Sequence, residues 1–193
     1  MTNTRARNFA VTVAKYFLLT MAISFLGWAF ETTYVYFQSG RFYNQGFMRL
    51  PFCPIYGCSV MVVYWLLGVP RKGVEDNGGV LLKRIQSPLG RWMTYALFAF
   101  LIPSAAELIV GSFFDRLFSL RLWSYQSYPL HINGYVCLPV SLAWTALIIF
   151  FMRYLFLPIK RTIFRAHDLL AISLAVLLFF IVTCDMTMQY LAL

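Results

Sequence analysis

The stretch at residues 20–37, TMAISFLGWAFETTYVYF, decides the class of this protein. It is rich in aromatic residues and long enough to be most of a membrane span, but it contains one carboxylate, Glu31. An ionisable group at that depth costs roughly 2.5 to 3.5 kcal/mol on insertion scales and persists where it is paired, hydrated or used. Glu31 is therefore a candidate functional residue.

The composition of the whole chain agrees with a membrane protein. Of the 193 residues, 61% are hydrophobic and 12% are charged, and the mean hydropathy is +0.70. A soluble domain carries about a quarter charged residues. The net charge of +9 does not indicate nucleic-acid binding, because the Lys and Arg residues form short clusters between apolar runs rather than one basic face.

The apolar runs predict an all-α fold, with one polytopic membrane domain over residues 1–193. We expect a helix bundle of five spans, at roughly 14–37, 52–69, 92–114, 135–157 and 169–190. The first run is longer than the apolar core of a signal peptide, and no small-x-small cleavage site follows it. It is therefore predicted to be retained as a span.

The distribution of basic residues predicts the orientation. Twelve of the 16 Lys and Arg residues lie in or beside the N-terminal tail and the connections 69–91 and 158–167, which alternate with the other connections. The remaining four are Arg41, Arg49, Arg116 and Arg121. By the positive-inside rule the N-terminus is cytoplasmic and the C-terminus is outside. An odd number of spans also argues against two equal inverted repeats, as in classical secondary transporters.

Three carboxylates are expected at one level of the membrane. Glu31, Glu107 and Asp185 lie 16, 16 and 17 residues beyond the charged residue at the inner end of the same span. At 1.5 Å per residue, each is roughly 24 to 26 Å along its helix, toward the outer side. Gly27 and Gly111 are each four residues from one of these acids and would let another helix approach closely.

This layer has three interpretations. The carboxylates could hold the bundle together, line a polar pocket for a ligand, or form a catalytic centre. The last is the least favoured, because the chain has no GxxxxGK[ST], HExxH or GxSxG motif and we assign no catalytic residue. No metal site or cofactor is predicted either, since Cys53 and Cys58 do not have a zinc-ligand spacing. The sequence leaves open a disulfide between Cys53 and Cys137.

Several short motifs resemble one known family. They are GWAFE at 27–31, NQGF at 44–47, PFCPIYG at 51–57, Glu107 with Gly111, LWSY at 122–125, INGYVCL at 132–138, and Trp144. Together they resemble the bacterial family of small membrane proteins called putative ABC-transporter permeases of the CmpB type, over about residues 24–145. The resemblance implies a multi-pass protein of the bacterial inner membrane with a role in transport. If ATP drives that transport, the ATPase is a separate subunit.

We therefore expect a transporter component that binds a small or amphipathic ligand in an outer-leaflet polar pocket. The predicted ligand-binding residues are Glu31, Glu107, Asn133, Tyr56, Arg49, Trp28 and Asp185. The expected partners are the lipid bilayer and a separate ATPase on the basic loops 69–91 and 158–167; a homo-oligomer is left open. The alternatives are a membrane-embedded enzyme that acts on a lipid-linked substrate, with Glu31 or Glu107 as acid or base, and a structural subunit of a membrane complex.

Overall fold

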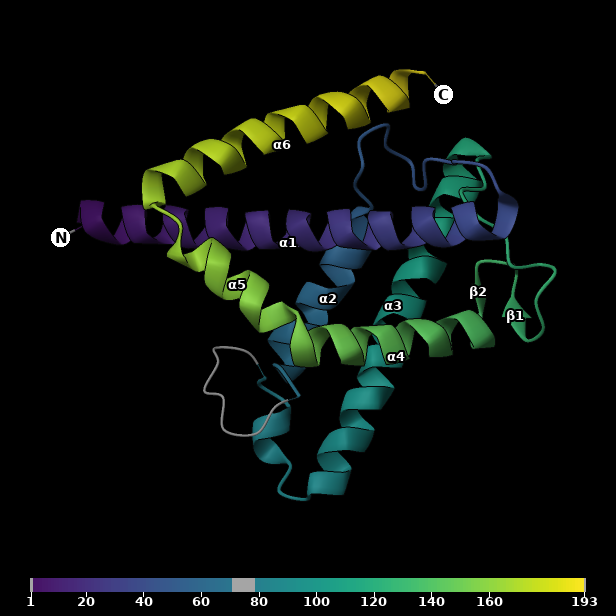
Figure 1. The fold of residues 1–193 in the computed structure, drawn as a ribbon, viewed down its shortest axis with the longest axis horizontal. Coiled ribbons are helices and arrows are strands. Elements are labelled where there is room, and N and C mark those ends of the chain that lie inside the picture. Colours follow the sequence, from purple (N-terminus) through teal and green to yellow (C-terminus); the bar gives the residue numbers. More distant parts are fainter. Residues whose placement is uncertain (1, 71–78, 193) are drawn as a thin grey trace. The chain divides into compact units, whose positions relative to one another are not determined.

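The computed structural model describes residues 2–70 and 79–192 (Figure 1). The helices are α1 (Thr2–Ser39), α2 (Pro54–Leu67), α3 (Pro88–Phe118), α4 (Leu138–Tyr154), α5 (Phe156–Arg165) and α6 (Asp168–Leu191), with a short 3-10 helix at Leu82–Arg84. Two strands, β1 (His131–Ile132) and β2 (Val136–Cys137), form an antiparallel hairpin. The all-α prediction is confirmed. Part of the predicted inner loop, with Arg71, Lys72, Glu75 and Asp76, lies outside the described residues.

Glycine and proline define several helix ends. α1 ends before Gly40, which has a φ of 68° and donates its N–H to the carbonyl of Tyr36 at 2.8 Å. α2 begins at Pro54, and α3 begins at Pro88 after the N-cap Ser87. Proline is tolerated at these positions because the first-turn N–H groups have no partner within the helix.

Three described helices are long and apolar enough to cross a membrane, at Arg5–Ser39, Pro88–Phe118 and Asp168–Leu191. The pair α4 and α5 meets the same criteria together, but it is bent by 49° between Tyr154 and Phe156. α2 has 14 residues, fewer than the roughly 20 of a typical span. The described residues thus contain three or four candidate spans, and the prediction of five spans stays a prediction.

The prediction of a basic loop at 158–167 is wrong, because most of that segment lies in the helix α5. Pro158 does not interrupt the helix, since it lies in the first turn, where proline removes no intrahelical hydrogen bond. The basic side chains of α5 lie mainly on one face of the helix and the apolar side chains mainly on the other, so the helix is amphipathic. Basic composition alone therefore indicated a loop where the periodicity supports a helix.

The chain divides into two compact units. The first comprises residues 1–57 and 158–193, and in it α6 lies along α1 (Figure 1). Lys15 donates to Asp168 Oδ1 at 2.7 Å and to the carbonyl of Phe164 at 3.2 Å. The ring of Tyr16 meets that of Phe164 edge-on, with centroids 5.0 Å apart. The ion pair thus joins the N-terminal half of α1 to the start of α6.

Within this first unit the beginning of α2 packs against α1 through glycine. A Cβ on Gly57 would overlap Ser24 Oγ and the carbonyl oxygen of Thr20. A Cβ on Gly27 would lie 2.6 Å from the Cβ of Tyr56. Small residues at a helix crossing allow the backbones to approach closely. Gly57 on α2 is therefore required by the close approach of α1, and Gly27 on α1 by the close approach of Tyr56.

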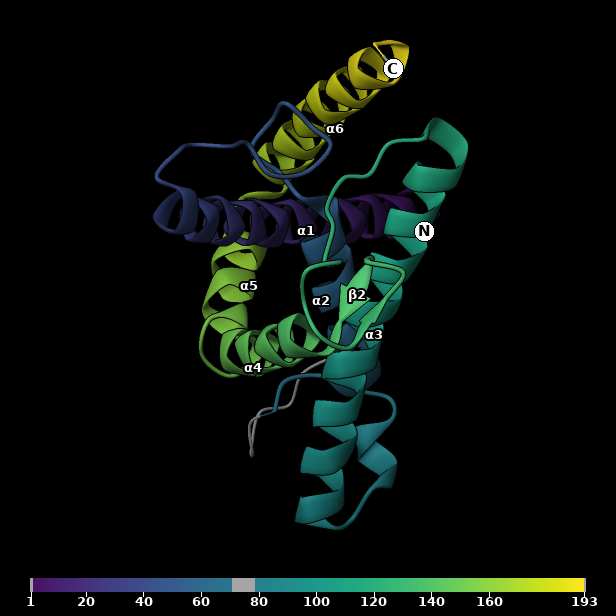
Figure 2. The same ribbon diagram turned by 90° about the vertical axis from the view of Figure 1, so that its right-hand side faces the viewer.

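The second unit comprises residues 58–157. Its interior includes Tyr64 and Phe156, both fully buried, with ring centroids 4.6 Å apart. Tyr95 on α3 donates its hydroxyl to the carbonyl of Gly68 at 3.3 Å. Ser104 on α3 donates to Ser141 Oγ on α4 at 3.0 Å. These contacts join α2, α3 and α4 within the unit, and the hairpin lies beside α3 (Figure 2).

Replacing Gly57 with leucine is expected to destabilise the first unit. The new side chain would overlap the backbone of α1, and overpacking of this kind costs about 1 to 3 kcal/mol. Thermal unfolding of the detergent-purified chain, followed by size-exclusion fluorescence, should give a lower Tm. The matched control is Cys58→Leu, at an exposed neighbouring position of the same helix. An unchanged Tm for Gly57→Leu would contradict the packing described here.

Candidate functional site

Glu31 is held by a tyrosine from the start of α2. Tyr56 donates its hydroxyl to Glu31 Oε2 at 2.7 Å, and the two residues are 25 positions apart in the chain. Tyr56 can reach this position because Gly27, one helical turn before Glu31, leaves room for its side chain. The carboxylate is partly exposed, so a second molecule can reach it. Two of the predicted binding residues therefore meet directly.

Trp28 lies on the same side of α1, three residues before Glu31. Its indole N–H donates to Asn44 Oδ1 at 2.6 Å. The amide of Asn44 in turn donates to the carbonyls of Met48 and Arg49, each at 3.0 Å. The indole of Trp28 thus anchors the connection that follows α1, and Asn44 organises the backbone of that connection.

Asp185 binds the same connection from α6. Its Oδ2 accepts the backbone N–H groups of Arg49 at 3.0 Å and Leu50 at 3.3 Å. Arg49 therefore contributes its main-chain amide to this contact, and its side chain is exposed. The charge of Asp185 is partly satisfied by these two donors. A role for the Arg49 guanidinium in ligand binding stays a prediction.

Cys53 closes the connection back onto α1. Its backbone N–H donates to the carbonyl of Ser24 at 3.2 Å, and its thiol donates to the carbonyl of Gln45 at 3.5 Å. Gly46 has a φ of 91°, and a Cβ there would lie 2.7 Å from the Cys53 sulfur. All four cysteines are free in the structure. Cys53 lies in the first unit and Cys137 in the second, and the disulfide between them stays open.

Glu107 and Asn133 belong to the second unit. Glu107 on α3 is buried, with 7% of its surface exposed. One turn later, a Cβ on Gly111 would lie 3.1 Å from the ring of Tyr135 and 3.3 Å from that of Trp123. Asn133 is exposed at the tip of the β1–β2 hairpin. The prediction that Glu107 and Asn133 share a ligand site with Glu31 stays a prediction.

The hairpin is built by its turn residues. Asn133 and Gly134 have φ values of 51° and 77°, and Tyr135 donates its N–H to the carbonyl of Ile132 at 3.0 Å. Positive φ at both central residues is the geometry that favours Asn-Gly in tight hairpins. Asn133 thus has a conformational role here. The Asn-Gly pair is a sequence signal for a hairpin, which was missed among the polar residues of the connection 115–134.

A polar cluster beside this hairpin was also missed. Asp115, near the end of α3, accepts the Tyr135 hydroxyl at 2.6 Å and the Arg121 guanidinium at 3.0 Å. Arg121 also lies over the Tyr135 ring, 5.4 Å from its centroid. The hydrogen bond to Asp115 raises the pKa of the Arg121 guanidinium. The nearby Asp and Arg, six residues apart at the end of a span, were the available signal for this cluster.

Replacing Asp185 with alanine is expected to release the connection 40–53 from α6. The amides of Arg49 and Leu50 lose a charged acceptor, so their hydrogen exchange should become about tenfold faster. Exchange followed by mass spectrometry in detergent measures this directly. Met188→Ala, at an exposed position of the same helix, is the control. Equal exchange in Asp185→Ala and the parent protein would show that the contact does not hold the connection.

The comparisons with known proteins give one match. No curated protein and no solved structure shows a significant match to the chain. Residues 17–190 match the family described as "Putative ABC-transporter type IV", which confirms the resemblance drawn from the motifs. The match runs from α1 to α6 and includes Glu31, Tyr56, Glu107, Asn133 and Asp185. The chain is a member of this family, and its long apolar helices make it a membrane protein.

Proposed function

We propose that this chain is the membrane-embedded component of a transporter and that it binds a small or amphipathic ligand at Glu31. One observation carries the proposal. Within the described part of the chain, the hydrogen bond that Glu31 makes comes from the neutral hydroxyl of Tyr56, and no Lys or Arg forms an ion pair with it. A structural carboxylate at membrane depth is expected to have a cationic partner. Glu31 lacks one there and is partly exposed, so a ligand can supply the positive charge.

The side chains around Glu31 favour an amphipathic ligand with a positive group. Phe25 stacks on Trp28 with ring centroids 5.8 Å apart, and Phe52 approaches Phe25 at 6.2 Å. Aromatic faces attract cations and bury apolar groups, and Trp28 also lies one turn before the carboxylate. A ligand with a cationic head and an apolar body would therefore find both contacts in the first unit. Asp185 and the backbone of Arg49 fix the connection that borders it.

The topology belongs to the same proposal. We take α1, α2, α3, the pair α4 and α5, and α6 as five spans of a bacterial inner-membrane protein, with the N-terminus inside and the C-terminus outside. The charge distribution supports this order. The basic side chains of Arg161 and Arg165 on α5 are exposed and would be available to an ATPase subunit on the cytoplasmic side. The family match supports such a partner, because ABC transporters use a separate nucleotide-binding component.

Binding of tetraphenylphosphonium, a lipophilic cation, to the full chain in nanodiscs tests the ligand site. We expect Glu31→Gln to weaken binding about tenfold while the Tm changes by only a few degrees, because Gln retains an acceptor for Tyr56. The control is Asp115→Asn, which removes the same charge from the second unit. If Glu31→Gln lowers the yield of folded protein and leaves the affinity of the remainder unchanged, the carboxylate is structural.

Reporter fusions test the topology. Alkaline phosphatase is active only outside the cytoplasm, so a fusion after Leu193 should be active and a fusion after Gly79 inactive. The first result is expected for an odd number of spans, and the second requires α2 to cross the membrane. An active fusion after Gly79 would show that α2 does not span, and an inactive fusion at the C-terminus would indicate an even number of spans.

A further inference from the structure

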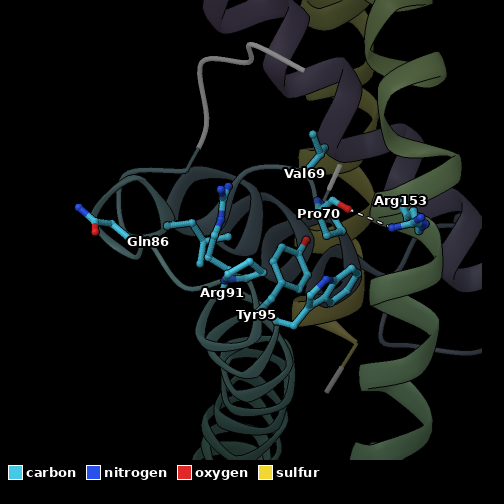
Figure 3. A pocket seen from close by; sticks show the side chains of 9 residues that line it. Val69, Pro70, Gln86, Arg91, Tyr95 and Arg153 are labelled. Carbon is cyan, nitrogen blue, oxygen red and sulfur yellow. Dashed lines mark hydrogen bonds between the residues drawn. The ribbon is translucent and has the colours of Figure 1, made fainter. Parts of the chain in front are cut away.

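The second unit contains a cavity that the proposed function does not use. It has a volume of about 480 Å³ and is formed by the end of α2, the start of α3 and the end of α4 (Figure 3). Small-molecule sites have volumes of roughly 300 to 1,000 Å³. All nine lining residues belong to the second unit, so the cavity is a property of that unit alone.

Two arginines give the cavity its charge. Arg91 from α3 and Arg153 from α4 both line it, and among the described lining residues, which leave out 71–78, there is no carboxylate. Neither arginine forms an ion pair with an acid in the described part of the chain. Because both arginines line one cavity, an anion bound in it would be attracted by two positive charges.

Arg153 is already oriented toward the cavity. Its guanidinium donates to the carbonyl of Pro70 at 3.3 Å and through Nε to the Tyr154 hydroxyl at 3.2 Å, and it lies 5.9 Å from the centroid of the Trp92 ring. These two hydrogen bonds use two of the five N–H donors of the group, which leaves three for a ligand. The fixed planar guanidinium suits the oxygens of a phosphate.

Neutral donors and apolar groups complete the lining. Gln86 precedes α3 and is exposed at the edge of the cavity, and Tyr95 closes its interior with 1% of its surface exposed. The apolar wall comes from Val69, Leu82 and Pro88. The lining therefore offers positive side chains for a charged group and apolar side chains for a hydrocarbon chain.

The position of the cavity in the helices indicates the kind of ligand. α3, a candidate span, begins at Pro88, and Arg91 and Trp92 lie in its first turns. Arg153 lies in the last turn of α4. Arginine and tryptophan at the end of a span lie at the level of the lipid headgroups, whichever side of the membrane that end occupies. The N-terminus of a long helix also favours negative charge.

We infer that this cavity binds a phosphate-bearing anion between Arg91 and Arg153, with the apolar wall accepting the glycerol and the first acyl carbons when the anion is a phospholipid headgroup. A soluble phosphate would use the same two arginines without the wall. The site is separate from Glu31, which selects a positive group, and does not depend on the transport proposal.

Native mass spectrometry of the full chain in detergent tests this inference, with phosphatidylglycerol, phosphatidylcholine and sodium phosphate as separate probes. We expect phosphatidylglycerol to bind more tightly than phosphatidylcholine, and the variant Arg91→Gln/Arg153→Gln to weaken that binding about tenfold. The control variant is Arg161→Gln/Arg165→Gln, which removes the same charge from exposed positions of α5. If inorganic phosphate binds and is weakened by the same double substitution, and the two lipids bind equally, the ligand of the cavity is a soluble phosphate and not a lipid headgroup.

A third variant keeps the test decisive if the double substitution does not fold. Gln86→Glu places a negative charge at the exposed edge of the cavity, where it should not disturb packing, and it should also weaken anion binding. Equal losses in the α5 control and the cavity variants would show general attraction between basic residues and anionic lipid, and would overturn the site. Unchanged binding in both cavity variants would overturn it as well.

Discussion

The hydrogen bond between Tyr56 and Glu31 depends on a close approach of α1 and the start of α2 at two glycines. Tyr56 reaches the carboxylate only because Gly27 and Gly57 leave α1 and the start of α2 without side chains where they meet. The same glycines determine where the connection after α1 must return, since Cys53 donates to the carbonyl of Ser24 immediately before α2 begins. A carboxylate that is costly in an apolar helix thus becomes tolerable through steric space rather than through a neighbouring cation.

The polar groups of the first unit have two different roles. Lys15 and Asp168 form an ion pair that joins α1 to α6, and Asp185 accepts two backbone amides of the connection 40–53. The first contact pairs two opposite charges, and the second gives Asp185 two backbone N–H donors. Glu31 differs, because its described hydrogen-bond partner is a neutral side-chain hydroxyl rather than a lysine or a pair of backbone amides. This contrast between three acids of one unit is the reason to place a ligand at Glu31.

The proposed ligand site of the second unit is positively charged, whereas the proposed site of the first unit is negatively charged. Its cavity has two arginines and no acid among the lining residues that the structure describes, whereas Arg121 pairs with Asp115 beside the hairpin and Tyr135 donates to the same carboxylate. The proposed ligands therefore differ in sign, with a cationic group at Glu31 and an anionic group between Arg91 and Arg153. With separate sites of this kind, a lipid and the transported molecule would not compete for the same residues.

Composition and periodicity determined the membrane class and the helical fold, because apolar length and helix period are local properties of the chain, whereas the depth of Glu31 stays a prediction. The match of the motifs to one family was also readable from the residues. Only the tertiary structure decided that Tyr56 is the partner of Glu31, that Asp185 binds an amide 136 positions away, and that Arg91 and Arg153 face one cavity. Such pairs depend on how helices cross, and helix crossing depends on side-chain packing between segments distant in sequence. The helix α5 and the hairpin at Asn133 were different cases, since their signals were present in the sequence but were weaker than the basic and polar composition around them.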